Sequence, residues 1–306
     1  MTVRNYAQPH KGRVRDLLVF LSVALSLSAC SSATPAASNP SSAGSSAPAV
    51  SRAGSSPGAS TTAGSLAYTG LPPDWTYTGD NGPANWNTLS AGCADGPQSS
   101  QSPIDIESST LVPDNPASSG ALTIDYLPTV FGVENTGKTI EGVPADLHAD
   151  FITIDGSKYY LQQFHFHNPS EHTVDSQSFG AELHLVNKSD DGAFAVLGVL
   201  LDTRGANAPL AELFDKMPIE KADDQTVVAL DEKINPAELI PAGSTIARYS
   251  GSLTTPPCTE PVIWSVFLTP ASISSDQLAA LSAIVPGSHR PVQPLNGRII
   301  NDVQGS

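Results

Sequence analysis

Basic residues are scarce in this sequence. Of its 306 residues, 15 are Lys or Arg and 30 are Asp or Glu, so the formal net charge is −15. Residues 1–29 hold four basic residues and one acidic residue, so the rest of the chain carries a net charge of −18. A chain this acidic is poorly suited to binding nucleic acid or an anionic bilayer surface, because both repel negative charge. We therefore expect no nucleic-acid partner and no membrane contact through the protein surface.

The sequence also lacks an apolar run long enough to cross a bilayer. Its most apolar stretch, residues 17–27, falls well short of the ~20 residues that a transmembrane helix needs. The stretch follows a basic segment, which is typical of a secretory signal, and ends in Leu-Ser-Ala-Cys at residues 27–30, which resembles a bacterial lipobox. We expect a signal peptide over residues 1–29 and a lipid on Cys30, which would place the exported protein on the outer side of the bacterial cell membrane, at the cell surface or in the periplasm. An ordinary signal peptide cleaved nearby and an uncleaved anchor are the alternatives.

Charged and large apolar side chains are almost absent from residues 31–66. This segment is nearly all Ser, Ala, Gly, Pro and Thr, with Arg52 as its one charged residue. Such a composition cannot bury enough apolar surface to offset the entropy of the chain. We expect a flexible tether over residues 30–67, followed by one folded domain over residues 68–303.

Cysteine is rare as well. The chain has three cysteines, and a lipid on Cys30 would leave only Cys93 and Cys258. An exported protein can keep a disulfide, and a single remaining pair favours one. Two separate buried thiols are the alternative.

Helical patterns are few, and strand-like runs are common. Residues 209–216 and 274–284 have helical patterns, the second with Ser274 or Ser275 as a possible N-cap. The strand-like runs alternate with turn residues and include residues 122–126, 151–154, 159–161, 194–201 and 262–267. We see no internal repeat. The sequence therefore predicts a predominantly β, mostly antiparallel domain with few short helices.

One of the strand-like stretches carries histidines on one face. Side chains alternate between the two faces of an extended strand. In the sequence Gln-Phe-His-Phe-His, this places Gln163, His165 and His167 on one face, and Phe164 and Phe166 on the other. A His-x-His pair in a β-rich protein is often only a pair of strand histidines with ordinary hydrogen-bond partners, so this stretch alone leaves both interpretations open.

A second stretch adds a third imidazole. The run 181–186 places Glu182 and His184 on one face, and the loop before it is long enough to bring it back beside the first stretch. Three imidazoles around one open position are what a catalytic zinc ion needs. Glu182 and Gln163 would accept hydrogen bonds from the outer nitrogens of two of the rings.

Several further motifs occur in order over residues 70–300. They are Trp75-Thr-Tyr77, Asn81-Gly-Pro83 with Trp86, Gln101-Ser-Pro-Ile-Asp105, the two histidine stretches, Glu171-His-Thr-Val-Asp175, Gly251-Ser-Leu-Thr-Thr-Pro-Pro257 and Arg290-Pro-Val-Gln-Pro-Leu-Asn296. This ordered set resembles the α-class carbonic anhydrases. The resemblance implies a central twisted, roughly ten-stranded sheet with Zn²⁺ at the base of a conical cleft, bound by His165, His167 and His184. Cys93 and Cys258 stand where exported relatives of that family carry a disulfide.

The resemblance also implies roles for other residues. Members of the family hydrate CO₂ reversibly to bicarbonate and a proton by a zinc-bound hydroxide, which Thr254 and Glu171 would orient. Thr255 would line the bicarbonate side of the site, and His172 and Tyr249 match buried structural positions near Glu182. Sulfonamides and small anions are the expected inhibitors. The apolar wall for CO₂ would come from Val186, Val196, Leu253 and Trp264.

One position departs from the family pattern. Fast relatives carry a cleft histidine that relays the proton, and here the matching segment places Lys138 there. A lysine ordinarily titrates near 10.4, whereas a histidine near 6.5 both takes up and releases protons at neutral pH. We expect an active enzyme that is limited by proton transfer; a solvent-exposed Lys138 without a role is the alternative.

Two other functions remain compatible with the sequence. One is a catalytically weak or silent carbonic-anhydrase-like domain used for binding or adhesion. Silent relatives usually lack one or more of the zinc histidines, and this chain has all three. The other is a zinc esterase activity, which would use the same nucleophile as a side reaction.

Overall fold

Most of the described chain is β-structure. The computed structural model describes residues 74–113, 121–221 and 227–303. The expected signal peptide, Cys30 and the whole of the expected tether lie outside these residues. The strands are β1 (Asp105–Ile106), β2 (Val112–Pro113), β3 (Leu122–Asp125), β4 (Thr129–Asn135), β5 (Ile140–Pro144), β6 (Phe151–Ile154), β7 (Ser157–His167), β8 (Thr173–Val174), β9 (Ala181–Lys188), β10 (Phe194–Asp202), β11 (Val228–Ile234), β12 (Ile246–Gly251), β13 (Val262–Ser272) and β14 (Asn301–Val303).

Helices are short and few among the described residues, as predicted. The α-helices are α1 (Trp86–Leu89), α2 (Ala211–Lys216) and α3 (Ser275–Ile284), and the 3₁₀ turns are Gly79–Asn81, Pro83–Asn85, Ala91–Cys93, Ser108–Thr110, Ala208–Leu210 and Pro236–Leu239. Of the two candidate caps for α3, Ser274 is the N-cap. Its hydroxyl accepts from the Gln277 backbone N–H at 3.0 Å, and the Gln277 side chain accepts from the Ser274 backbone N–H at 3.1 Å. This reciprocal capping box fixes where α3 begins.

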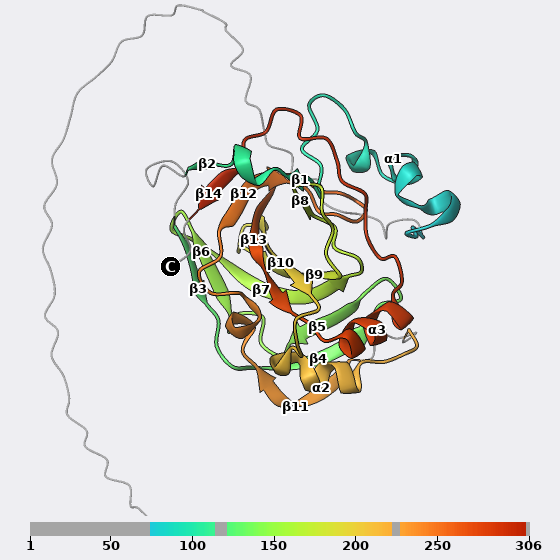
Figure 1. Cartoon of the computed structure of the whole chain (residues 1–306), viewed down its shortest axis with the longest axis vertical. Coiled ribbons are helices and arrows are strands. Elements are labelled where there is room, and N and C mark those ends of the chain that lie inside the picture. The colour runs from blue at the N-terminus through green and yellow to red at the C-terminus, as the bar shows by residue number, and fades with distance from the viewer. Residues whose placement is uncertain (1–73, 114–120, 222–226, 304–306) are drawn as a thin grey trace, which may run out of the picture. The chain divides into compact units, whose positions relative to one another are not determined.

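One large twisted sheet organises the molecule (Figure 1). It has 12 strands, somewhat more than the roughly ten expected, in the order β11-β4-β5-β7-β9-β10-β13-β12-β14-β2, with β6 pairing β7 and β3 pairing β6. The pairings are antiparallel except β10 with β13 and β14 with β2. β1 and β8 form a separate two-stranded sheet. The described part of the chain therefore has the predicted predominantly β, mostly antiparallel architecture in a single domain.

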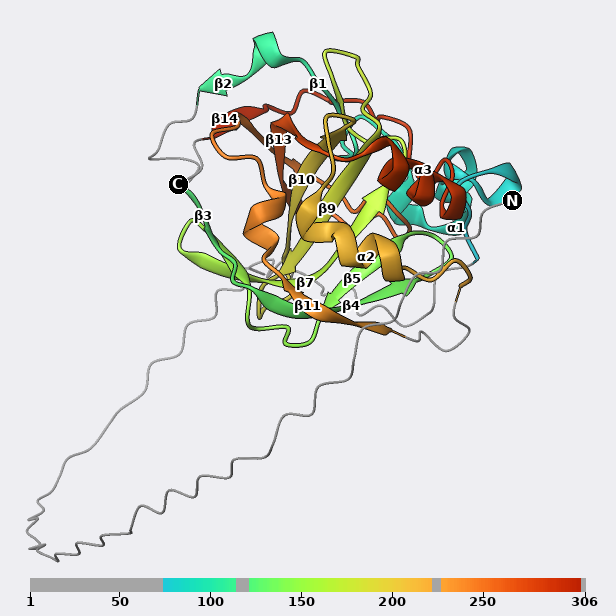
Figure 2. The same ribbon diagram turned by 60° about the horizontal axis from the view of Figure 1, so that its bottom comes forward.

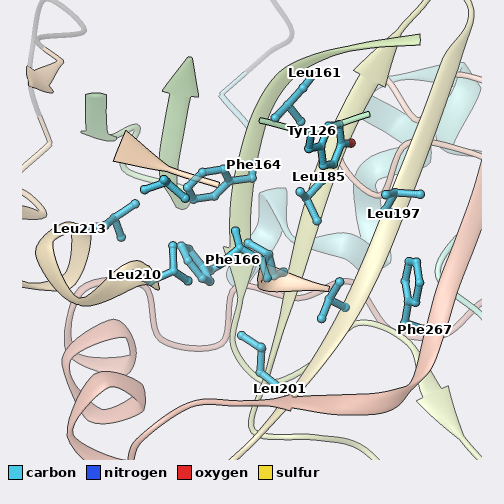
Figure 3. Packing of buried hydrophobic residues seen from close by; sticks show 14 of the residues in the cluster. Tyr126, Leu161, Phe164, Phe166, Leu185, Leu197, Leu201, Leu210, Leu213 and Phe267 are labelled. Carbon is cyan, nitrogen blue, oxygen red and sulfur yellow. The ribbon is translucent and has the colours of Figure 1, made fainter. Parts of the chain in front are cut away.

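The hydrophobic core covers one face of this sheet. Phe164 and Phe166 of β7 are fully buried there, and they pack with Leu185 of β9 and with Leu213 of α2 (Figure 3). Helices α2 and α3 lie over this face, and both contribute buried leucines to the same cluster (Figure 2). The alternation of β7 therefore turns its histidines toward the opposite face, where the candidate site lies. Among the described residues, no helix is both long enough and apolar enough to span a membrane.

A disulfide ties the N-terminal part of the domain to the loop between β12 and β13. Cys93 and Cys258 are bonded although 165 residues separate them in the sequence. Both are buried with Trp86, and the Cys258 backbone N–H donates to the Thr255 carbonyl at 2.8 Å. The predicted bridge is confirmed, and it holds the loop that carries Thr254 and Thr255.

Removing this bridge should destabilise the domain. Replacing both cysteines by serine removes a cross-link that restricts the unfolded chain, so the entropy of the unfolded state rises. The free energy of unfolding should therefore fall by about 3–5 kcal/mol in a denaturant titration. Wild type unfolded with a thiol reductant should show the same loss. An unchanged midpoint in the double variant would contradict the stabilising role.

Candidate metal centre

Three imidazoles meet because β7 and β9 are neighbours in the sheet. In this antiparallel pair His165 lies directly opposite His184, and His167 lies opposite Glu182. His167 and His184 are buried, and His165 is partly buried. One nitrogen from each of the three rings lies within 4.8 Å of the others. The structure thus brings together the three residues that the sequence singled out as metal ligands.

Each ring donates a hydrogen bond from its outer nitrogen. His165 Nδ1 lies 2.8 Å from Gln163 Oε1, and His184 Nε2 lies 2.9 Å from Glu182 Oε1. His167 Nδ1 lies 2.7 Å from the backbone carbonyl of Ser288. A carbonyl or carboxylate oxygen can only accept, so in each neutral ring the outer nitrogen carries the hydrogen. The inner nitrogens, Nε2 of His165 and His167 and Nδ1 of His184, therefore direct lone pairs at one point.

This arrangement fits a cation. His165 Nε2 and His167 Nε2 are 3.0 Å apart, and neither carries a hydrogen when its outer nitrogen does. Burial lowers the pKa of both rings well below the ordinary value, the neighbouring imidazoles lower it further, and burial also lowers the pKa of His184. Neutral nitrogen lone pairs that converge in this way suit a borderline-soft divalent metal with a tetrahedral preference.

A fully buried carboxylate holds this centre in place. Glu182 Oε1 accepts from His172 Nδ1 at 2.7 Å as well as from His184, and its Oε2 accepts from the backbone N–H groups of Glu171 and His172. Burial raises the pKa of Glu182, but the interactions with His172 and His184 outweigh it, and the net pKa lies well below the ordinary value. His172 Nε2 lies 2.7 Å from the Tyr249 hydroxyl, which extends the hydrogen-bond network to Tyr249. His172 and Tyr249 are thus buried beside Glu182, as predicted.

Glu171 lies on the other side of the imidazoles. Its Oε1 accepts from the Arg290 backbone N–H at 2.8 Å, and its Oε2 is 3.4 Å from His167 Nε2. Burial raises the pKa of Glu171 well above the ordinary value, while the nearby Thr254 hydroxyl and Arg290 lower it. Thr254 is close enough to exert this effect, yet the two side chains do not form a hydrogen bond of normal geometry, and Oε2 has no hydrogen-bond partner among the described residues.

A cavity of about 250 Å³ opens in front of the histidines. It is lined by Trp75, Tyr77, Thr136, Lys138, Thr139, Glu141, Gln163, His165, His167 and Thr255. Thr255 is thus one of the residues that line the cavity. The four apolar residues expected as a CO₂ wall lie together in a second core cluster beside His184, but they are not among the residues that line this cavity: Val186, Val196, Leu253 and Trp264.

Lys138 lines the same cavity, but its ammonium group contacts Trp75 and Asp74. Nζ donates a short hydrogen bond to the Trp75 backbone carbonyl, stands 4.9 Å from the centre of the Trp75 ring and lies 3.7 Å from Asp74 Oδ1. The lysine thus contacts the N-terminal segment of the domain rather than the histidines.

Sequence reasoning missed two contributors to the site. The contact of the Ser288 carbonyl with His167 leaves no signature in the sequence, because every residue has a backbone carbonyl. Glu141 was missed because strand β5 was not among the predicted strands; its alternation would have placed Glu141 on the histidine face. Glu141 lies opposite His165 in the sheet, and burial together with Glu134 raises its pKa to about 7.

Comparison with known proteins identifies the family. Residues 81–304 match the model of the eukaryotic-type carbonic anhydrase family. The chain belongs to the α-carbonic anhydrases. It is therefore a carbonic anhydrase, a lyase for the reversible hydration of CO₂.

Named relatives support this assignment over most of their length. The chain is 39% identical over 230 residues to a carbonic anhydrase of Klebsiella pneumoniae, covering 74% of this chain and 89% of that protein. It is 37% identical over 230 residues to a carbonic anhydrase of Nostoc, covering 74% and 85%. The solved α-carbonic anhydrase of Thermovibrio ammonificans in complex with sulfanilamide is 37% identical with a TM-score of 0.69, covering 74% of this chain and 98% of that one.

Replacing the central carboxylate tests the architecture of the carbonic anhydrase site. Glu182→Gln removes the negative charge of a carboxylate that accepts four hydrogen bonds. It also places an amide N–H₂, which can only donate, beside groups that are themselves donors. The free energy of unfolding should fall by about 3 kcal/mol in a urea titration at neutral pH. Glu107→Gln, at an exposed carboxylate, is the matched control and should stay within about 0.5 kcal/mol of wild type. Equal stability of the two variants would show that Glu182 does not organise the site.

Proposed function

We propose that this carbonic anhydrase binds Zn²⁺ through Nε2 of His165, Nε2 of His167 and Nδ1 of His184, and uses it to convert CO₂ to bicarbonate and a proton. The observation that supports this most directly is the convergence of three neutral imidazole nitrogens whose outer N–H groups are all held by acceptors. Acceptors of this kind are the usual support of metal-binding histidines, because they fix the tautomer and the ring orientation. Three nitrogen ligands and one open position are typical of catalytic zinc.

The metal would supply the nucleophile. Zinc on three neutral ligands is a Lewis acid that lowers the pKa of a coordinated water to about 7, which provides hydroxide chemistry at neutral pH. The protein's own contribution is to hold ligands, orient hydrogen bonds and shape the cavity.

Thr254 and Glu171 would orient hydrogen bonds at the open position. An ionised carboxylate only accepts, so Glu171 would take the hydrogen of the Thr254 hydroxyl and leave the Thr254 oxygen free to accept from the site. The Arg290 N–H at Glu171 Oε1 favours the ionised carboxylate, and a cation on the three imidazoles would lower its raised pKa further.

The surrounding residues would accommodate substrate and inhibitors. CO₂ carries no net charge, so we assign its place to the apolar side of His184, formed by Val186, Val196, Leu253 and Trp264. Thr255 would contact bicarbonate from the cavity wall. Because the solved Thermovibrio relative contains sulfanilamide, we propose that aromatic sulfonamides and small anions also bind this site.

Stopped-flow CO₂ hydration with metal analysis tests the proposal. Wild type should contain one zinc ion and lose its activity on treatment with a chelator or a sulfonamide. His184→Ala should bind zinc more than about a hundredfold more weakly, because a direct ligand matters at least as much as an outer partner. Thr254→Val should keep its zinc and lose about a hundredfold in turnover, as expected for one oriented hydrogen bond in a buried site. A zinc-loaded wild type that hydrates CO₂ no faster than buffer would refute the proposed function.

We further propose that Lys138 leaves the enzyme limited by proton transfer. Its ammonium group donates a hydrogen bond to the Trp75 carbonyl, which supports a structural role for this side chain rather than a role in relaying protons. Lys138→His should raise turnover about tenfold in dilute buffer, and imidazole buffer should accelerate wild type more than the variant. Lys158→His, at an exposed lysine of β7, is the control. If neither the variant nor imidazole changes the rate, proton transfer at this position is not the bottleneck.

Export and lipid anchoring form a separate proposal. The basic leader, the apolar run and the Leu-Ser-Ala-Cys motif at residues 27–30 support a lipidated Cys30 that is joined to the enzyme domain by a tether. Cys30→Ser should move the protein from the membrane fraction to the soluble fraction of fractionated cells without loss of specific activity. A variant that stays membrane-bound would point to an uncleaved anchor.

A further inference from the structure

Glu141 places a carboxylate inside the catalytic cavity. It lies on β5 directly opposite His165 of β7, so both side chains point to the same face of the sheet. It lines the cavity together with His165, His167 and Gln163. An acidic residue therefore lies beside the position where the proposed reaction releases an anion.

This carboxylate has no neutralising partner among the residues that the structure describes. No hydrogen bond and no ion pair within 4.0 Å joins Glu141 to another described side chain, and the lysine of the cavity, Lys138, is engaged elsewhere. Its ammonium group donates to the Trp75 carbonyl and lies 3.7 Å from Asp74 Oδ1. The positive charge of Lys138 is thus held by Trp75 and Asp74, and the negative charge of Glu141 has no such partner.

Neighbouring groups strengthen the negative field. Glu134 of β4 lies directly opposite Glu141, so the two carboxylates share one face of the sheet, although Glu134 does not line the cavity. Tyr77 senses the same charges: burial raises the pKa of its hydroxyl well above the ordinary value, and the charges of Glu171 and Glu141 raise this pKa further. Tyr77 lines the cavity on the side of Trp75.

We propose that Glu141 determines the charge specificity of this site: its carboxylate weakens the binding of anions and favours ligands that carry a positive charge. The inference rests on the proposed function, because it concerns ligands of the same metal centre. It includes bicarbonate, which Glu141 would help to release, and inorganic anions, whose inhibition it would weaken.

Binding of three benzenesulfonamides tests this role. The compounds share the same head group and carry a para carboxylate, a para aminomethyl group or no charged substituent. Burial and Glu134 raise the pKa of Glu141 to about 7, so calorimetry at a pH of about 8.5 keeps the carboxylate ionised. In Glu141→Gln the anionic compound should bind about threefold more tightly and the cationic compound about threefold more weakly, while the neutral compound is unchanged.

Two variants serve as controls. Glu134→Gln should act in the same direction but more weakly, because Glu134 does not line the cavity and solvent screens its charge. Glu107→Gln should leave all three dissociation constants unchanged. The Michaelis constant for bicarbonate in the dehydration direction should fall about threefold in Glu141→Gln, in line with the anionic sulfonamide.

A second readout requires neither metal nor turnover. Of the three tryptophans, Trp86 and Trp264 are 0% and 1% exposed, so dissolved quenchers reach chiefly Trp75, which lines the cavity. In Glu141→Gln, quenching by iodide should increase and quenching by caesium should decrease, with the ratio of the two constants rising about twofold or more. Lys138→Met should change that ratio in the opposite direction, and Trp75→Phe should abolish the response.

The outcomes separate this inference from the proposed function. If the neutral sulfonamide fails to bind zinc-loaded wild type, the proposed metal centre is wrong, and the quenching ratio still decides whether Glu141 sets the charge of the cavity. Opposite shifts for the anionic and cationic compounds support the inference. If Glu141→Gln changes all three sulfonamides alike, or none of them, and leaves the quenching ratio unchanged, the inference is overturned.

Discussion

The candidate metal centre depends on the pairing register of β7 with β9. With His165 opposite His184, the three imidazoles share one face, and Phe164 and Phe166 share the other. A slip by one residue would bury the histidines in the core and expose both phenylalanines in the cavity. Burying two such rings contributes about 3–6 kcal/mol, so the hydrophobic core enforces the register before any metal is bound (Figure 3).

Buried carboxylates connect this strand pair to loops that are distant in the sequence. Glu182 of β9 accepts from two backbone N–H groups in the loop after β7, and Glu171 of that loop accepts from the backbone of Arg290. The disulfide of Cys258 adds the segment that carries Thr254. Such connections hold polar groups in position ahead of the reaction, so that little reorganisation is needed when charge develops. The stability of the domain and the geometry of its active site therefore depend on the same interactions.

Charge is separated within the small cavity. The ammonium group of Lys138 is held by the Trp75 carbonyl and by Asp74, while Glu141 lies opposite His165 of β7. The same cavity would otherwise be strongly attractive to anions once a divalent cation occupies the histidines.

The histidine face of this protein could be predicted largely from short-range patterns. Alternation along residues 163–167 and 181–186 assigned the histidines and their supporting Gln163 and Glu182 to one face, because the side-chain period of a strand is fixed by its backbone. The capping signal before α3 worked for a similar local reason. β4 and β5 were not predicted, and the Gly132 and Gly142 that interrupt their apolar pattern weaken the strand signal.

Local patterns could not show which distant groups complete the site. The Ser288 carbonyl reaches His167 across 121 residues of sequence, and nothing in the side chain of Ser288 announces this contact. Tertiary packing likewise determines two further features. The N-terminal segment supplies the acceptor for the Lys138 ammonium group, and the pairing of β4 with β5 brings Glu141 close to Glu134. The sequence by itself determined the three candidate metal ligands and their common face. Only the tertiary structure decided what supports them and what charge surrounds them, because those contacts join segments whose separation along the chain carries no periodic signal.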